Sequence, residues 1–381
     1  GGTALVLPGG GARAAYQVGV LKAISEMVPA RAPSPFSVIS GTSAGAINAA
    51  SLASHADRFA AGVGVLEAVW RGFSVQQVYE TGALAMLRSS MHWMASLVLG
   101  GLGRYNPHSL LDNRPLRTLL QQRMALERIE ANIRSGHLKA VAVTASSYRS
   151  GRSVTFFQGH PALVGWNRTR RSGQRAPITV DHLMASAAVP MIFPAISVGQ
   201  EYFGDGSIRQ NTPLSPAIHL GSSRMLVIAV RDEKVSQEPE DSPERRRPAL
   251  GEIAGYMLDT IFMDGLYGDL ERVTRINLLL EQIRSDAGES AATNLRRVET
   301  LLILPSRDIR DIAEEYAHQL PRAVRAYQAI ACLVRGETCR RIPLRGRRRS
   351  FGRQRIVLLQ GSRTSAQRQC VTATTPHRRW Y

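Results

Sequence analysis

Residues 38–50, VISGTSAGAINAA, combine three kinds of local sequence in one short segment. Val38 and Ile39 are typical of a buried strand, Gly41 and Gly45 flank a tight turn, and the alanines that follow suit a helix packed closely on a sheet. The G-x-S-x-G spacing matches a nucleophile elbow, whose sharp turn pushes the serine Oγ away from the backbone. Ser43 would equally suit a cap on the following helix, so both interpretations stay open on this segment alone.

Apolar runs elsewhere in the chain alternate with helical patterns. The runs typical of buried strands are residues 3–7, 36–40, 139–146, 153–158, 224–230 and 298–304. A helical pattern follows the first run, and a long one extends from residue 251 to about 283. Strands that alternate with helices in this way predict an α/β fold.

Positive charge is concentrated at the C-terminal end of the chain. The formal net charge of the 381 residues is +18, and residues 335–381 carry +12 of it, with 13 arginines, no lysine and one acid, Glu337. We interpret residues 331–381 as an arginine-rich tail that is disordered or frame-shifted, and residues 1–330 as one domain with a mobile loop at about 234–248. Because the body is only mildly basic, we do not expect nucleic acid binding.

The cysteine pattern gives no sign of a metal site. Cys332, Cys339 and Cys370 all lie in or beside the tail, and their spacing matches no common zinc motif. We therefore expect neither a disulfide framework nor a bound metal.

No run of about 18 apolar residues suggests a membrane-spanning helix. The best candidate, residues 91–102, is short and broken by glycines, and it is typical of a buried or lid helix. Residues 84–102 and 191–193 are compatible with an apolar lip at a membrane surface as well as with a core. No signal peptide is recognisable and the chain starts at Gly1, so we expect a missing native N-terminus and favour a cytoplasmic or peripheral membrane location.

A glycine run, Gly9, Gly10 and Gly11, separates the first expected strand from the first helix. Consecutive glycines allow backbone N–H groups to converge, and a helix N-terminus adds partial positive charge, which suits an oxyanion. A phosphate-binding loop is disfavoured because the Lys-Ser/Thr pair is missing and Ala14 replaces the last glycine of G-x-G-x-x-G. Arg13 either steers a phosphate-bearing substrate or is simply solvated.

Asp205 follows an aromatic, strand-like run and lies between Gly204 and Gly206. An aspartate between glycines is commonly only a turn residue. A serine nucleophile needs a base, however, and Asp205 is the acid best placed at a strand end. To act as that base it must lie within hydrogen-bonding reach of Ser43 Oγ, in a site that contains little water.

Four motifs in order resemble those of the patatin-like phospholipases: GGGAR at 9–13, GTSAG at 41–45, ASAAVPMIFP at 185–194 and DG at 205–206. The resemblance covers about residues 3–230, and residues 250–330 only loosely. It implies a three-layer α/β/α fold with a mainly parallel central sheet. It also implies a lipid acyl hydrolase with a Ser-Asp dyad, an acyl-enzyme intermediate and no metal or organic cofactor.

The resemblance assigns roles to individual residues. Ser43 would be the nucleophile and Asp205 the base, and the N–H groups of Gly10 and Gly11, with Gly9 beside them, would form the oxyanion hole. The positions expected to shape the turn or line the site are Gly41, Gly45, Pro190, Phe193 and Gly206. The substrate would be a phospholipid or another acyl lipid, with peripheral membrane contact.

Four positions depart from the family pattern. Pro8 stands where the family often has aspartate, Ala14 where it has glycine, Ala195 where it has a second proline, and Ser207 where it has alanine or glycine. None of these changes removes a reacting atom. Pro8 and Ala14 bear on the shape of the oxyanion loop, and so on rate rather than on reaction type.

Two other functions are compatible with the sequence. A Ser-Asp-His triad of the α/β-hydrolase type would take its histidine after the acid, and His219 and His318 both follow Asp205. The other alternative is an inactive body with a basic arm that binds lipid or nucleic acid. A glycine run placed before the serine fits the dyad family better than the triad, and the arginines of the arm are not interleaved with aromatic residues at a regular spacing.

Overall fold

The computed structural model describes residues 2–72, 111–231, 250–287 and 295–309, and the isolated positions 74, 77, 78, 109, 312 and 359–360. The loop expected at 234–248, the segment 84–102, His318 and all three cysteines lie outside the described residues. The same holds for the arginine-rich tail apart from residues 359–360.

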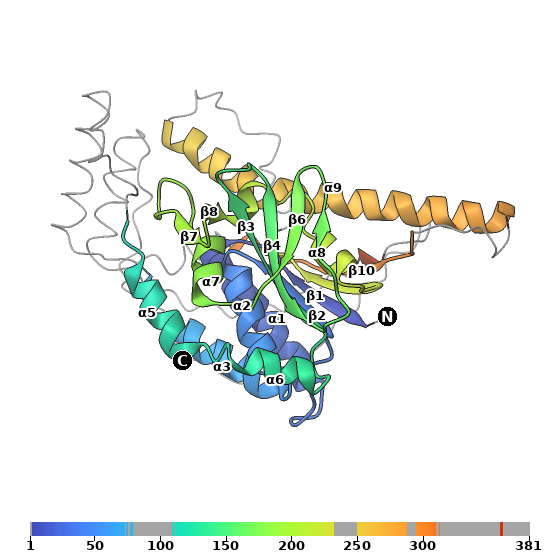
Figure 1. Cartoon of the computed structure of the whole chain (residues 1–381), viewed down its shortest axis with the longest axis horizontal. Coiled ribbons are helices and arrows are strands. Elements are labelled where there is room, and N and C mark those ends of the chain that lie inside the picture. The colour runs from blue at the N-terminus through green and yellow to red at the C-terminus, as the bar shows by residue number, and fades with distance from the viewer. Residues whose placement is uncertain are drawn as a thin grey trace.

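Helices and strands alternate along the described chain (Figure 1). The α-helices are α1 (Ala15–Glu26), α2 (Ala44–Ser54), α3 (Phe59–Arg71), α5 (Arg114–Arg123), α6 (Arg128–Arg134), α7 (Val180–Ser186), α8 (Ser215–His219) and α9 (Leu250–Ala287), with short 3₁₀ helices at Gly11–Ala14 and Gly206–Ile208. The strands are β1 (Thr3–Leu7), β2 (Val38–Thr42), β3 (Ala140–Ser147), β4 (Ser153–Gly159), β5 (Trp166–Asn167), β6 (Arg171–Arg175), β7 (Ile196–Val198), β8 (Glu201–Asp205), β9 (Arg224–Ile228), β10 (Glu299–Ile303) and β11 (Leu359–Gln360).

The strands form one mixed sheet whose centre is parallel. Its order is β11-β10-β9-β1-β2-β3-β4-β6-β5, and the neighbours from β10 to β3 all run parallel. Antiparallel pairs occur towards the edges, where β4 and β8 pair with β3 and β7 pairs with β8. The expected α/β fold with a mainly parallel central sheet is confirmed.

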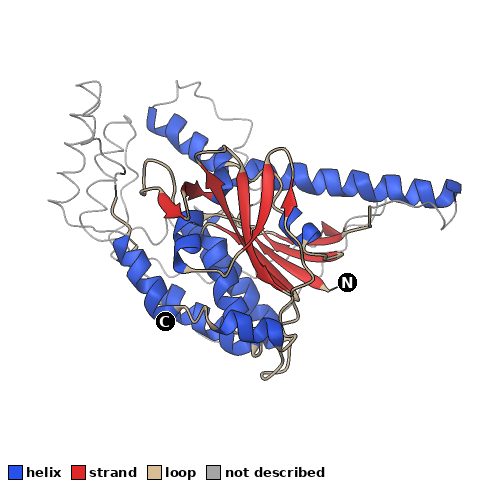
Figure 2. Ribbon diagram, viewed as in Figure 1, coloured by secondary structure: helices blue, strands red, loops and turns tan. Residues whose placement is uncertain are grey.

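Helices cover both faces of this sheet (Figure 2). Side chains alternate along β1, so that Leu5 and Leu7 join the core shared with α1, α2, α3, α5, α6 and α7. Ala4 and Val6 join the opposite core, to which α8 and α9 contribute. The molecule therefore has the three layers α/β/α.

Helix α2 packs unusually close to the sheet. Ala46, Ala49, Ala50 and Ala53 along it are fully buried. A methyl group at Gly45 would overlap the backbone carbonyl of Leu7, and one at Gly41 would overlap the carbonyl of Gly45. Small side chains are thus a steric requirement where strand β2 turns into this helix.

The substitution Gly45→Ala tests this close approach. We expect it to lower the free energy of unfolding by about 2–3 kcal/mol, because the added methyl group meets backbone that cannot move aside cheaply. Gly64→Ala in the exposed part of α3 is the matched control, since a methyl group there meets nothing within 4 Å. Urea unfolding should show this control unchanged or stabilised by up to about 1 kcal/mol. Equal stability of the two variants would contradict the packing argument.

Candidate active site

Strands β2 and β8 meet head to head along one edge of β3. Strand β2 runs parallel to β3 as far as the pair Thr42–Thr144. Strand β8 arrives from the opposite direction and ends with Asp205 opposite Ala145, the next residue of β3. The other edge of β3 is occupied there by β4. The chain therefore leaves β2 at Ser43 just where β8 delivers Asp205.

Ser43 has a strained backbone and a directed side chain. Its φ of 54° lies in the left-handed region that non-glycine residues rarely adopt. It occupies the N-cap position of α2, but its side chain makes no capping hydrogen bond. Instead, Ser43 Oγ donates to Asp205 Oδ2 at 2.6 Å. The hydroxyl is committed to the carboxylate and not to the helix.

Asp205 is fully buried, and its surroundings change its acidity. Burial disfavours the charged form and raises the pKa of Asp205 from 3.8 to about 6, while hydrogen bonds from Ser43 and Ser207 oppose that rise. The backbone N–H of Ser207 donates to Asp205 Oδ1 at 2.9 Å. Each carboxylate oxygen thus accepts a hydrogen bond, and the group is a stronger base than an exposed aspartate.

The motif at 185–194 contacts both members of this pair. Ser186 Oγ accepts the backbone N–H of Ser43 at 2.8 Å and donates to the carbonyl of Thr144 at 2.6 Å. The carbonyl of Ala188 accepts the backbone N–H of Asp205 at 2.8 Å. This motif therefore ties the turn at Ser43 to the end of β8. The motif was recognisable in the sequence, but no role was expected for Ser186.

Other expected site positions surround the same junction. Pro190 and Phe193 are half-buried, and the backbone N–H of Phe193 donates to the carbonyl of Val189 at 2.9 Å. A methyl group at Gly206 would overlap the carbonyl of Thr144, so glycine is required where β8 ends. The side chain of Gln210 bridges strands β2 and β3, since it hydrogen-bonds to Thr42 and Thr144. Gln210 was not expected from the sequence.

The glycine loop lies at the start of α2. A methyl group at Gly45 would come within 2.7 Å of the carbonyl oxygen of Pro8, and one at Gly10 would overlap Val230. Gly11 has a φ of 55°, which favours glycine. Gly9 is buried, and the half-buried Arg13 donates its backbone N–H to the carbonyl of Gly10 at 3.1 Å. The structure thus brings the loop expected from the sequence beside the turn at Ser43.

Two buried amide side chains support this loop through hydrogen bonds, and neither was expected from the sequence. Gln17 and Asn48 are fully buried. Gln17 Nε2 donates to the carbonyls of Pro8 at 2.8 Å and Ile228 at 3.3 Å, and its Oε1 accepts from Asn48 Nδ2 at 3.0 Å. Trp70 Nε1 donates to Asn48 Oδ1 at 2.8 Å. We call Gln17, Asn48 and Trp70 the amide chain; a polar residue within an apolar helix face was its only sequence signal.

His219, one of the two histidines considered for the alternative triad, does not contact the Ser43–Asp205 pair. His219 Nδ1 contacts the carbonyl of Ser215 at 2.8 Å, and its ring stacks on Trp166 at 4.6 Å between centroids. His318 lies outside the described residues. Asp205 contacts Ser43 directly, with no histidine between them.

The part of the chain that the structure describes contains neither a candidate metal site nor a candidate membrane-spanning helix. No three His, Cys, Asp or Glu side chains there come together in a way that suits a metal ion. No helix there has both the length and the apolar character needed to traverse a bilayer.

A family model covers the region that contains the candidate active site. The patatin-like phospholipase model matches residues 5–218, more than half of the chain. This chain belongs to the patatin-like phospholipase family. The match contains every candidate position from Gly9 to Gly206, and family membership supports lipid hydrolase activity. No curated protein sequence matches the chain significantly.

Solved structures similar to this patatin-like protein include VipD from Legionella pneumophila, at 14% identity and a TM-score of 0.36 over 79% of this chain and 61% of that chain. A structure of SpcU with ExoU from the type III secretion system of Pseudomonas aeruginosa matches at 14% identity and a TM-score of 0.29, over 78% and 65%. Another, of the type III effector ExoU, matches at 15% identity and a TM-score of 0.27, over 89% and 66%. The chain thus spans less than two thirds of each.

Replacing Asp205 with asparagine should stabilise this patatin-like protein in a pH-dependent way. The pKa of Asp205 is about 6 in the folded protein, whereas an unperturbed aspartate has a pKa of 3.8. The buried carboxyl group therefore holds its proton more tightly in the folded state than in the unfolded state. The resulting penalty is absent below about pH 4 and complete above about pH 6. We expect Asp205→Asn to raise the free energy of unfolding by about 1–3 kcal/mol at pH 8 and by less at pH 4.5. Urea unfolding at both values checks this, and a gain independent of pH would contradict it.

Proposed function

We propose that the protein hydrolyses carboxylic ester bonds of phospholipids or other acyl lipids, with Ser43 as nucleophile and Asp205 as base. The observation that carries this proposal is the 2.6 Å hydrogen bond from Ser43 Oγ to a fully buried carboxylate. The strained turn that presents Ser43 and the family membership of the chain support it. Neither step of the reaction requires a metal or an organic cofactor.

In the proposed acylation step, Asp205 takes the proton of Ser43 Oγ as this oxygen attacks the ester carbonyl. A pKa of about 6 leaves Asp205 ionised at neutral pH while making it a better base than an exposed aspartate. The negative charge that develops on the carbonyl oxygen is stabilised by the N–H groups of Gly10 and Gly11, with Gly9 beside them. Each such donor contributes about 3–4 kcal/mol in comparable sites.

Collapse of the tetrahedral intermediate breaks the ester bond and leaves the acyl group on Ser43. The departing alkoxide of the lipid receives the proton held by Asp205. Water then attacks the acyl-enzyme while Asp205 again accepts a proton, and the second collapse returns that proton to Ser43 Oγ. The products are a fatty acid and the deacylated lipid.

The surrounding residues have supporting roles in this proposal. Gly41, Gly45 and Gly206 permit the close approach of the backbone segments that place the pair. Pro190 and Phe193 line the acyl site, and Arg13 contacts a substrate phosphate or supports the loop.

The domain organisation and location complete the proposal. Residues 1–330 form the catalytic domain and residues 331–381 an arginine-rich tail, of which Leu359–Gln360 pair with β10. The protein acts in the cytoplasm or at a membrane surface, as a peripherally bound enzyme.

The variant Ser43→Ala tests the proposal directly. Fatty acid release from mixed phospholipid vesicles should fall by about 10³-fold or more, because the variant lacks the nucleophile. Ser54→Ala, at the far end of the same helix, is the matched control, since its Oγ only hydrogen-bonds to the carbonyl of Ala50. Circular dichroism checks that both variants are folded. Full activity in folded Ser43→Ala would refute the assignment.

The amide chain should affect the rate of catalysis rather than substrate binding. Gln17→Met keeps the side-chain volume but removes the hydrogen bonds to Pro8 and Ile228 at the base of the glycine loop. We expect kcat on a soluble ester to fall by about 10- to 100-fold with KM within about twofold, because small shifts of a catalytic group are costly.

The exposed Gln122 of α5 provides the control variant Gln122→Met. A rise in KM with unchanged kcat for Gln17→Met, or the same loss in both variants, would contradict a positioning role.

A further inference from the structure

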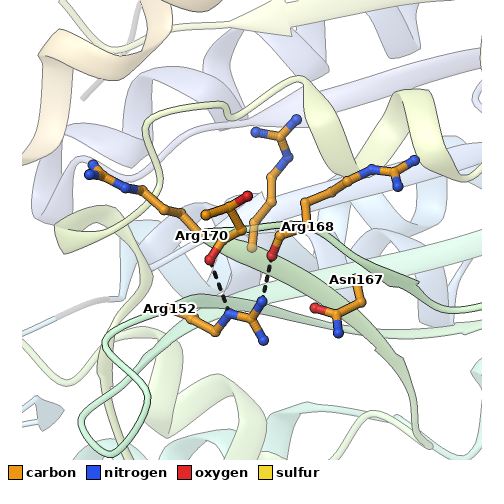
Figure 3. Close-up of a pocket in the computed structure, with 6 residues that line it drawn as sticks. Arg152, Asn167, Arg168 and Arg170 are labelled. Carbon is orange, nitrogen blue, oxygen red and sulfur yellow. Dashed lines mark hydrogen bonds between the residues drawn. The ribbon is translucent and has the colours of Figure 1, made fainter.

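An arginine-rich surface lies at one edge of the sheet, outside the candidate active site. Residues 148–180 contain six arginines and no acidic residue. Arg152 and residues 167–171 line a shallow depression of about 680 Å³ (Figure 3). We call Arg149, Arg152, Arg168 and Arg170 the arginine rim.

Hydrogen bonds to backbone carbonyls hold the loops of the arginine rim together. Arg152 Nη2 donates to the carbonyl of Arg168 at 2.6 Å, and its Nε donates to the carbonyl of Thr169 at 3.3 Å. The backbone N–H of Ser153 also donates to the carbonyl of Arg170. These hydrogen bonds fix the turn between β5 and β6 beside the start of β4, and the arginines of this turn are exposed.

The charges of the rim are neither neutralised nor focused on one point. No carboxylate among the described residues pairs with Arg149, Arg168 or Arg170. Figure 3 shows the side chains of Arg168 and Arg170 projecting away from each other. Such divergent guanidinium groups suit an extended anionic surface better than a single phosphate ion.

The rim and the Ser43–Asp205 pair both lie near the carboxyl end of strand β3. Asp205 lies opposite Ala145 on β3. Two residues further along this strand, the backbone N–H of Ser147 donates to the carbonyl of Arg152 at 3.0 Å. At the spacings within a sheet, this places the backbone of Arg152 roughly 10 Å from that of Asp205.

Exposed apolar and aromatic side chains occur next to the rim and in the motif at 185–194. Tyr148 is 52% exposed, Tyr202 is 61% exposed and Met191 is 65% exposed. Tyr148 and Tyr202 are neighbours, because the backbone N–H of Tyr148 donates to the carbonyl of Tyr202 at 3.0 Å. Tyrosines beside arginines are typical of surfaces that lie in the headgroup region of a bilayer.

We propose that the arginine rim, with Tyr148, Tyr202 and Met191, docks the protein on a bilayer that contains anionic lipids. Docking at this edge turns the Ser43–Asp205 pair towards the lipid. The inference rests on the proposed function for the fate of that lipid. The docking itself is measurable without catalysis.

The test compares two double variants in full-length Ser43→Ala protein. Arg168→Ala/Arg170→Ala removes two rim charges. Arg123→Ala/Arg134→Ala removes two exposed charges at the end of α5 and on α6, which lies at the amino end of β3, opposite the rim (Figure 1). The arginine-rich tail is present in both, so it contributes equally to each.

Cosedimentation with phosphatidylcholine vesicles, with and without phosphatidylserine, measures the partitioning. Each arginine near an anionic leaflet strengthens partitioning about fivefold, so the rim variant should bind phosphatidylserine vesicles about 25-fold more weakly and the control variant should bind as the parent does. Equal weakening of both variants, or none in either, would overturn the inference. Displacement by millimolar inorganic phosphate at constant ionic strength would also overturn it, in favour of a small-anion site.

Hydrogen exchange provides a second readout that does not depend on the tail. Residues 148–152 and 167–171 should become protected on anionic vesicles, while residues 123–134 should not. Absence of this protection in a protein that does bind the vesicles would place the docking surface elsewhere.

Hydrolysis of a soluble ester by the wild-type protein separates this inference from the proposed function. Loss of docking in the rim variant, together with an inactive wild type, would support the docking surface and refute the hydrolase. An active wild type, together with normal docking of the rim variant, would support the hydrolase and refute the docking surface.

Discussion

The head-to-head meeting of β2 and β8 along one edge of β3 is the constraint on which the rest of the site depends. One strand cannot continue past Thr42 because the other already ends at Asp205 beside the next residue of β3. The chain must therefore turn sharply at Ser43, and this turn requires small residues at Gly41 and Gly45. A serine and an aspartate separated by 162 residues come into hydrogen-bonding contact as a direct result.

This geometry has a cost in free energy that the surrounding structure must offset. The backbone of Ser43 is strained, and a carboxylate is held away from water, with hydrogen bonds from Ser43 and Ser207 to compensate. The offset comes from the dense packing of α2 on the sheet and from polar bridges such as Ser186, which satisfies groups on both sides of the junction. A strained serine beside a carboxylate made more basic by burial suits the ester hydrolysis proposed above, at the expense of stability.

The parallel centre of the sheet also explains which loops lie near the Ser43–Asp205 pair. Parallel strands bring their carboxyl ends to one side, and the loops that follow β1 and β2 therefore meet there. The antiparallel turn after β3 brings Tyr148 and Arg152 to the same side, and strand β8 brings Tyr202 there. The positions of the glycine loop, the Ser43–Asp205 pair and the arginine rim are thus consequences of one topology. The amide chain belongs to the layer beneath, where it connects the glycine loop to α1, α2 and α3.

Local sequence determined the elements whose signals lie within a few residues: the buried strands β1, β2, β3, β4, β9 and β10, the glycine-flanked turn and the alanine-rich helix. Ordered motifs also singled out Ser43 and Asp205. Only the tertiary structure decided that these side chains touch, that His219 stacks on Trp166 instead, and that Gln17 holds the glycine loop. Strand β6, whose sequence RSGQR has no apolar alternation, was equally invisible. The physical reason is that hydrophobic periodicity reports which face of an element is buried, whereas hydrogen bonds between distant segments depend on the register of strands that no local pattern records.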